Sequence, residues 1–203
     1  MEIKYTKTAV ITDDAGNPWP CEYLGKGHFS TCWKSTNTIG ERVVFTLTNS
    51  EDYGKEILAR TINASDLDKR KHLPVVKREG DLNDKTVYKM PLYSKLTAKH
   101  KMAWAQAKML RTLFDQVRRE FLNNCNHEYE HLYRYRSIEI CQEFVNQLVP
   151  GQLADALQAL LDTMCDYGSS MLFEFPTRNL CVDSEGRLIL LDIIFDTEKV
   201  RRK

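Results

Sequence analysis

The sequence predicts an α+β chain in which a strand-rich first part precedes a mainly helical second part. In the first ninety or so residues, short runs of β-branched and apolar residues alternate with turn residues. From Thr97 onward, apolar residues recur at intervals of three and four, which indicates long helices. After Gly168 the pattern returns to short strands around a turn at 183–186. We therefore expect two lobes, 1–93 and 94–203.

The first lobe is expected to form a five-stranded antiparallel sheet with one helix. Ser50 can cap a helix over Glu51–Ile62, because its hydroxyl satisfies free amides at a helix start. The sequence Gly80–Asp84 suits the turn of a hairpin between the last two strands. Six segments have the β-branched and apolar character of strands, and are candidates for the five: Thr8–Thr12, Cys21–Leu24, Phe29–Trp33, Arg42–Thr48, Leu73–Arg78 and Thr86–Met90.

The second lobe is expected to be a reduced, mainly helical lobe that ends in a small hairpin. Pro150 and Gly151 interrupt the helical pattern, and a further helix follows from Gln152 to about Tyr167. The hairpin would pair 179–182 with 187–191. The helices carry apolar stripes that should face the core, formed by Trp104, Leu110, Leu113, Phe114, Val117, Phe121 and Leu122, and by Leu153, Leu157, Leu160, Leu161 and Met164.

Composition excludes several classes of protein. The 203 residues include 29 Lys and Arg against 28 Asp and Glu, and a net charge of +1 gives no clear signal for nucleic acid or a membrane surface as partner. No apolar run approaches the roughly 18 residues of a spanning helix, so we expect a cytoplasmic protein. The six scattered cysteines fit reduced, buried thiols. The basic runs 69–72 and 199–203 are expected to be solvated.

A glycine-rich turn between two expected strands is the first candidate for binding chemistry. Gly25 and Gly27 flank Lys26, and Ser30 follows them. Glycines let the backbone turn tightly and bring its amides close to phosphate oxygens. Alone, this pattern also fits an ordinary hairpin.

A second group of polar residues lies near the other end of the chain. Glu174 stands five residues before Asn179, and Asp192 follows the expected hairpin, thirteen residues after Asn179. The order of these motifs resembles the protein kinase superfamily, in which a Gly-rich loop, a catalytic loop ending in Asn and a metal-binding Asp occur in this order. The segment Leu24–Ser30 is similar to the Gly-rich loop of the early serine/threonine kinases of T7-like podophages.

The resemblance implies a kinase-like fold that binds ATP and Mg²⁺ between two lobes. Asn179 and Asp192 would hold magnesium, and Glu174 would take the position of the catalytic base. The protein would be a divergent phage-type serine/threonine kinase acting on a host protein in the host cytoplasm. The nucleotide would contact the Gly-rich loop and a following strand. It would also contact the helix whose acid matches the one that orients the family's lysine, and the hinge. The residues at these places are Gly25, Lys26, Gly27, Ser30, Val44, Glu56, Met90 and Leu92.

Departures from the family pattern leave a second class open. Where the family has Val-Ala-Ile-Lys, the chain reads Val43–Thr46 and has no lysine, although Lys26 or Lys34 could supply the charge. Glu174 replaces the usual Asp, and only eleven residues follow Asp192, too few for an activation segment. The alternative is a catalytically inactive pseudokinase that binds and inhibits a host protein.

The segment His127–His131 supports a third reading. It fits the pattern H-E-x-x-H, which on a helix places two imidazoles on one face for zinc and leaves the Glu as a general base. Glu139 or Glu143 could provide a third ligand. Polar residues surround the motif, whereas the helix of a zinc peptidase buries it, so the zinc metallopeptidase is the least favoured of the three hypotheses.

Overall fold

The computed structural model describes residues 8–27, 30–49, 53–66, 70–124 and 136–198. The chain divides into two compact units. The first unit joins Met1–Lys55 to Val75–Leu92, and the second joins Glu56–Pro74 to Tyr93–Lys203. The last boundary between the units thus follows Leu92, next to the boundary expected after residue 93. Residues 56–74, expected in the first lobe, belong to the second unit.

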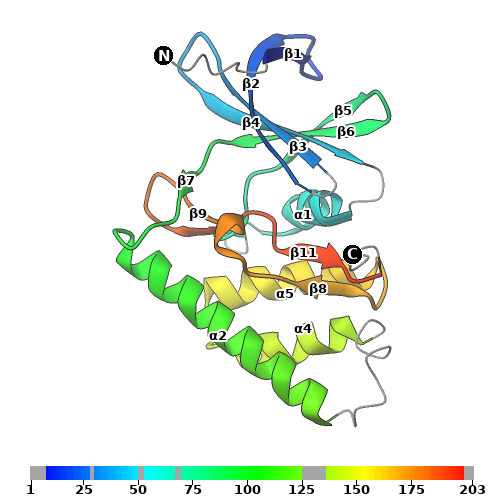
Figure 1. Cartoon of the computed structure of the whole chain (residues 1–203), viewed down its shortest axis with the longest axis vertical. Coiled ribbons are helices and arrows are strands. Elements are labelled where there is room, and N and C mark those ends of the chain that lie inside the picture. Colours follow the sequence, from blue (N-terminus) through cyan, green and yellow to red (C-terminus); the bar gives the residue numbers. More distant parts are fainter. Residues whose placement is uncertain (1–7, 28–29, 50–52, 67–69, 125–135, 199–203) are drawn as a thin grey trace, which may run out of the picture. The chain divides into compact units, whose positions relative to one another are not determined.

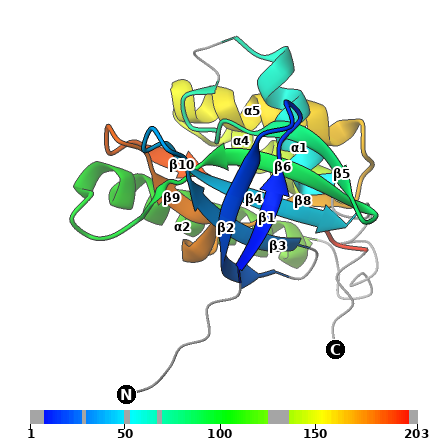
Figure 2. The same ribbon diagram turned by 90° about the horizontal axis from the view of Figure 1, so that it is seen from above.

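The first unit contains one antiparallel sheet with the strand order β1-β2-β3-β4-β6-β5 (Figure 1). The described residues form six strands rather than the five expected, because β1 pairs with the start of β2 and extends the sheet by one edge (Figure 2). The strands are β1 (Thr8–Thr12), β2 (Pro18–Lys26), β3 (Ser30–Thr36), β4 (Arg42–Asn49), β5 (Lys77–Leu82) and β6 (Lys85–Pro91).

Strand β5 begins later than the sequence predicted. The expected strand Leu73–Arg78 is wrong over most of its length, because its first residues are buried in irregular structure and Pro74 has no N–H to donate to a ladder. The connecting turn is two residues long, with φ of 49° at Asn83 and 60° at Asp84, as in a type I′ hairpin. The apolar character of Leu73 and Val76 therefore reflects burial, and not a strand, whereas Val75 is exposed.

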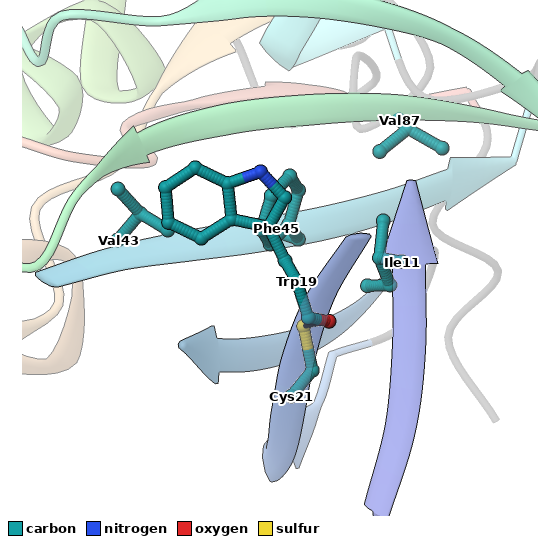
Figure 3. Close-up of a cluster of buried hydrophobic side chains, with 6 residues drawn as sticks. All are labelled: Ile11, Trp19, Cys21, Val43, Phe45 and Val87. Carbon is teal, nitrogen blue, oxygen red and sulfur yellow. Dashed lines mark hydrogen bonds between the residues drawn. The ribbon is translucent and has the colours of Figure 1, made fainter. Parts of the chain in front are cut away.

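One face of the sheet is buried by its own side chains (Figure 3). Trp19 and Phe45 meet edge to face with ring centroids 5.6 Å apart. Because side chains alternate along a strand, the neighbours of Phe45 on β4 point to the opposite face. The buried cluster consists of Ile11, Trp19, Cys21, Val43, Phe45 and Val87.

The second unit is mainly helical, with two small sheets. Helix α1 (Tyr53–Ala64) crosses from the first unit into the second. The turn Asp183–Gly186 joins the predicted hairpin β9–β10, so the prediction for this segment is confirmed. The other elements are α2 (Lys101–Asn124), α4 (Ser137–Asn146), α5 (Gln152–Cys165), β7 (Ser94–Lys95), β8 (Met171–Phe173), β9 (Leu180–Val182), β10 (Leu188–Leu190) and β11 (Ile194–Asp196).

The helical stripes form the core of the second unit, with two exceptions. Leu157, Leu160 and Met164 of α5 are fully buried, as their spacing predicted. On α2, Trp104 and Leu122 are exposed instead. Four phenylalanines from α2, α4 and the β8 region contact one another through their rings, namely Phe114, Phe144, Phe173 and Phe175.

The described cysteines are all free thiols, and their burial differs. Cys21 and Cys141 are buried, as expected, whereas Cys165 is exposed. Burial raises the pKa of the Cys141 thiol to about 12, which keeps this side chain protonated and unreactive. No helix in the described ranges is long and apolar enough to cross a membrane.

Candidate functional site

The side chain of Asn179 is bonded to both of the other residues that the sequence predicted for catalysis, Glu174 and Asp192. Its Nδ2 donates to Glu174 Oε1 at 3.1 Å and also to the main-chain oxygen of Asp192, thirteen residues ahead. Its own carbonyl oxygen accepts from Leu191 N at 2.9 Å. The side chain is buried, with 8% of its surface exposed. The structure therefore brings Glu174, Asn179 and Asp192 together within the second unit.

Short strands on both sides fix this geometry. In the hairpin, Leu180 pairs with Leu190, so Asn179 and Leu191 face each other directly outside the ladder. In the second small sheet, Phe173 pairs with Ile194, and Glu174 N donates to Ile193 O at 2.8 Å. Strand register thus decides which residues of the two segments are neighbours.

The turn between β9 and β10 holds that register. The Asp183 carboxylate accepts from Glu185 N at 3.0 Å and from Arg187 N at 2.9 Å, an arrangement typical of aspartate in turns. Gly186 has a φ of 76°, a conformation that glycine adopts without steric cost. The turn is therefore defined by an aspartate and a glycine, two residue types from which a turn can be predicted in the sequence.

His72 supports the hairpin from its other edge, and sequence analysis missed it. Its Nδ1 lies 2.8 Å from Leu188 O, and because a carbonyl can only accept, Nδ1 carries the proton. Leu190 N in turn donates to His72 O at 2.8 Å. Burial lowers the pKa of this imidazole. The expectation that the run 69–72 is solvated is wrong for His72, which is 5% exposed; a single His in a basic run gives no signal of burial.

Glu174 has the properties of a proton acceptor that is partly removed from water. Burial raises the pKa of its carboxyl group, and the nearby charge of Asp192 raises it further. Arg178 and the hydrogen bond from Asn179 act in the opposite direction. A carboxylate with a raised pKa is a better base than one in free solution.

The glycine-rich turn lies in the first unit. Strand β2 continues through Gly25 and Lys26, and Gly27 N donates to Ser30 O at 2.8 Å to close the turn. At Gly25, φ lies outside the left-handed region and a Cβ atom would meet no heavy atom within 4 Å. The fold itself therefore does not require a glycine there, whereas close approach of a ligand to the backbone would.

The remaining positions assigned to nucleotide binding in the first unit lie on β4 and at the end of β6. Val44 pairs with Met90 and lies on the face opposite Phe45. Leu92 N donates to Arg42 O at 2.9 Å, and Met90 is buried. Thr46, the residue in the place of the family's lysine, is only 1% exposed.

The two lysines considered as replacements have different surroundings. Lys34 Nζ lies 2.8 Å from Glu22 Oε2, so its charge is engaged in an ion pair on the sheet. Lys26 is exposed and belongs to the glycine-rich turn itself. Of these two side chains, Lys26 is therefore the one that could follow a ligand held by the turn.

Glu56 contacts a tyrosine of its own unit. Sequence analysis matched it to an acid that orients a strand lysine, but that strand has no lysine and Glu56 is exposed. The Tyr167 hydroxyl is hydrogen-bonded to Glu56, and Arg60 Nη1 donates to the same hydroxyl at 3.0 Å. Burial, followed by the bond to Glu56, raises the pKa of Tyr167.

The segment His127–His131 lies outside the described residues. Its suggested third ligands have other partners, because Arg136 forms an ion pair with Glu139, and Gln147 Nε2 donates to Glu143 Oε1 at 2.8 Å. Within the described ranges, the one group of three potential metal ligands is Asp13, Asp14 and Glu79. Two lysines offset part of the charge of these three acids, since Lys89 Nζ is 3.1 Å from Glu79 Oε1 and Lys77 Nζ is 2.7 Å from Asp14 Oδ2.

The likeness to known proteins comes from solved structures and not from sequences. No protein-family profile matches the sequence, and no curated protein matches it. The structure is similar to the BubR1 kinase domain with a TM-score of 0.39 and 12% sequence identity, over 98% of this chain and 50% of that domain. The chain thus spans about half the length of this kinase domain.

Proposed function

We propose that this chain is a divergent phage-type serine/threonine kinase-like protein that binds ATP with Mg²⁺ and acts on a host protein in the host cytoplasm. The observation that carries the proposal is the amide of Asn179, which joins Glu174 to Asp192 across one hairpin. Phosphoryl transfer needs positioning and charge neutralisation more than covalent chemistry from the protein. A base and two metal ligands on one rigid segment suit that requirement.

The donor set fits magnesium. Asp192 offers carboxylate oxygens and Asn179 offers Oδ1, because its Nδ2 is the atom that donates to Glu174 and to Asp192 O. Hard oxygen ligands of this kind are those that Mg²⁺ prefers, together with phosphate oxygens and water. Bound there, Mg²⁺ would neutralise negative charge on the phosphates.

Each unit has its own role in the proposal. In the first unit, the glycine-rich turn would bring its backbone close to the phosphate oxygens, and Lys26 would add a positive charge. In the second unit, Glu174 accepts the proton of a serine or threonine hydroxyl. The hydroxyl oxygen forms a bond to the γ-phosphorus, the bond from that phosphorus to the β–γ bridging oxygen breaks, and ADP leaves.

One observation favours a second candidate function, a pseudokinase that binds and inhibits its host target. The strand position of the family's lysine holds the buried Thr46, and the nearby Lys34 is paired with Glu22. A site without this charge could bind nucleotide and still fail to stabilise the transition state. The two functions therefore differ in transfer, and not in the residues that hold magnesium.

Thermal unfolding with ATP and Mg²⁺ tests the proposal. A ligand at a hundredfold its Kd stabilises the folded chain by about 2.7 kcal/mol, which raises Tm by roughly 5–10 °C for a chain of this size. We expect this shift to require Mg²⁺ and to disappear in Asp192→Asn. The matched control is Asp196→Asn, a partly exposed aspartate on β11, which should retain the shift.

Two outcomes would overturn the nucleotide site: no shift at millimolar ATP, or a full shift in Asp192→Asn. Labelled phosphate from γ-labelled ATP, incubated with a bacterial lysate, separates the two functions. Incorporation that depends on Asp192 identifies an active kinase and excludes the pseudokinase. A shift in Tm without incorporation favours the pseudokinase.

A further inference from the structure

Two adjoining hollows lie along α2 in the second unit. The larger has a volume of about 470 Å³ and the smaller about 290 Å³. Both are lined by Arg111 and Asp115, so the two hollows adjoin at these residues, and together they are called the groove. Glu174 lines the smaller hollow, and Thr177 and Leu180, on either side of Asn179, line the larger. The groove therefore runs beside the segment that carries the proposed base.

One stripe of α2 forms the charged wall of this groove. Its members recur at intervals of four and three residues, which places them on one face of a helix. Trp104 stands at one end and is 41% exposed. Three of the members are cationic and one is anionic, so the wall is positively charged. The stripe consists of Trp104, Lys108, Arg111, Asp115 and Arg118.

The opposite side of the groove is largely apolar. Leu172, Phe173 and Phe175, all buried, line the hollow that contains Glu174. Arg111 stands where the two hollows meet, and its Nη1 donates to Thr177 Oγ1 at 3.3 Å. The groove therefore has the cations of α2 on one side and, at its smaller hollow, a wall backed by buried apolar side chains on the other.

We propose that this groove binds an extended acidic segment of the acceptor protein and brings its serine or threonine hydroxyl to Glu174. This inference rests on the proposed function and names the class of acceptor. The wall from Trp104 to Arg118 is about 21 Å long at 1.5 Å per residue, which is the length of roughly six residues of extended peptide. Its charges select acidic side chains, while the carboxylate of Glu174 selects a neutral hydroxyl at the end.

The charge pattern favours a peptide over a nucleic acid. A continuous phosphate backbone would meet Asp115 in the middle of the groove and Glu174 at its end. A peptide can place its acidic residues opposite Lys108, Arg111 and Arg118, and uncharged residues elsewhere. The selection therefore depends on the alternation of charge along α2, and not on total charge.

Fluorescence anisotropy with a labelled twelve-residue peptide of Glu and Ser around a central Leu tests this groove in the full chain, without nucleotide or Mg²⁺. We expect it to bind at least tenfold more tightly than the same peptide with Lys in place of Glu, and more tightly than a single-stranded oligonucleotide of equal length. Lys108→Glu should weaken binding about tenfold, because it reverses one charge of the wall. Arg119→Glu is the matched control and should change Kd less than twofold, since Arg119 is exposed on α2 but lines neither hollow.

Equal binding of the acidic and basic peptides, tighter binding of the oligonucleotide, or an unchanged Kd in a Lys108→Glu chain with normal Tm would overturn the inference. Trp104→Ala provides a second variant, expected to weaken binding severalfold through loss of the apolar end of the wall. Asp192→Asn should leave peptide binding unchanged. Failure of the nucleotide site would thus be seen in the ATP-dependent Tm alone, and failure of the groove in peptide binding alone.

Discussion

The two units hold their candidate residues in different ways. In the second unit, the Asn179 side chain donates to Glu174 and Asp192, and its backbone is bonded to Pro176 and Leu191. In the first unit, the described part of the glycine-rich turn is closed by the bond from Gly27 N to Ser30 O. The segment around Asn179 is therefore held by side-chain and backbone bonds together, whereas the described part of the turn is held by a backbone bond.

Replacement of Asn179 gives the largest expected effect, because it removes the side chain that bonds to both Glu174 and Asp192 in the second unit. Asn179→Ala removes a buried donor and leaves the Asp192 carbonyl oxygen without that bond, so the free energy of unfolding should fall by about 2 kcal/mol. The ATP-dependent rise in Tm should also disappear. Urea unfolding measures the first effect. Asn146→Ala, on the exposed end of α4, should change stability by less than about 0.5 kcal/mol; an equal loss in both variants would contradict a special role for Asn179.

Acid should weaken the two units in different pH ranges. In the second unit, burial lowers the pKa of His72 below its ordinary value of 6.5, so the unfolded chain binds the proton more readily. Its contribution is therefore complete above pH 6.5 and is lost as the pH falls below that value. In the first unit, hydrogen bonds led by that from the Trp19 indole lower the pKa of Asp13 from 3.8 to about 2. Its contribution, about 1–2 kcal/mol, is lost only between pH 4 and pH 2.

The variant His72→Gln separates these two ranges, because Gln can donate to Leu188 O but does not titrate. We expect the decrease in Tm between pH 7.5 and pH 5.5 to be smaller in His72→Gln than in the parent chain. His100→Gln, at a partly exposed position before α2, should behave like the parent. The assignment to His72 is wrong if all three chains lose the same number of degrees.

Two glycine replacements give the smallest effects and sharpen the comparison. Gly25→Ala should leave the free energy of unfolding within about 0.5 kcal/mol of the parent, because the new Cβ meets no neighbour, yet it should reduce the ATP-dependent rise in Tm. Gly186→Ala should cost about 1 kcal/mol, because its φ of 76° disfavours any side chain. A stability loss at Gly25 as large as at Gly186 would show that the turn is constrained by the fold, and not by a ligand.

Patterns within short windows of the sequence predicted those elements that depend on interactions between residues close in the sequence. The stripe of α5 and the hairpin around Asp183–Gly186 follow from spacing and turn residues, and the interval between Asn179 and Asp192 follows from that hairpin. These are features in which the same few residues determine both the pattern and the structure.

Features that depend on distant partners could not be predicted in this way. His72 is buried because a segment more than a hundred residues away lies against it, as the bond to Leu188 shows. Leu73 and Val76, before β5, are buried without belonging to a strand. Trp104 interrupts the apolar stripe of α2, because it lines a groove and is exposed. A short stretch of sequence shows how hydrophobic such residues are, but it does not show which distant part of the chain packs against them.

The hairpin between Asn179 and Asp192 sets which residues of its two strands lie opposite each other. Its strands pair residue for residue, so a shift of one residue in their register would move Asp192 away from the Asn179 amide. Exchange of Ser184, an exposed turn residue, would leave that alignment intact. The alignment of Asn179 with Asp192 therefore depends on the register of this short ladder.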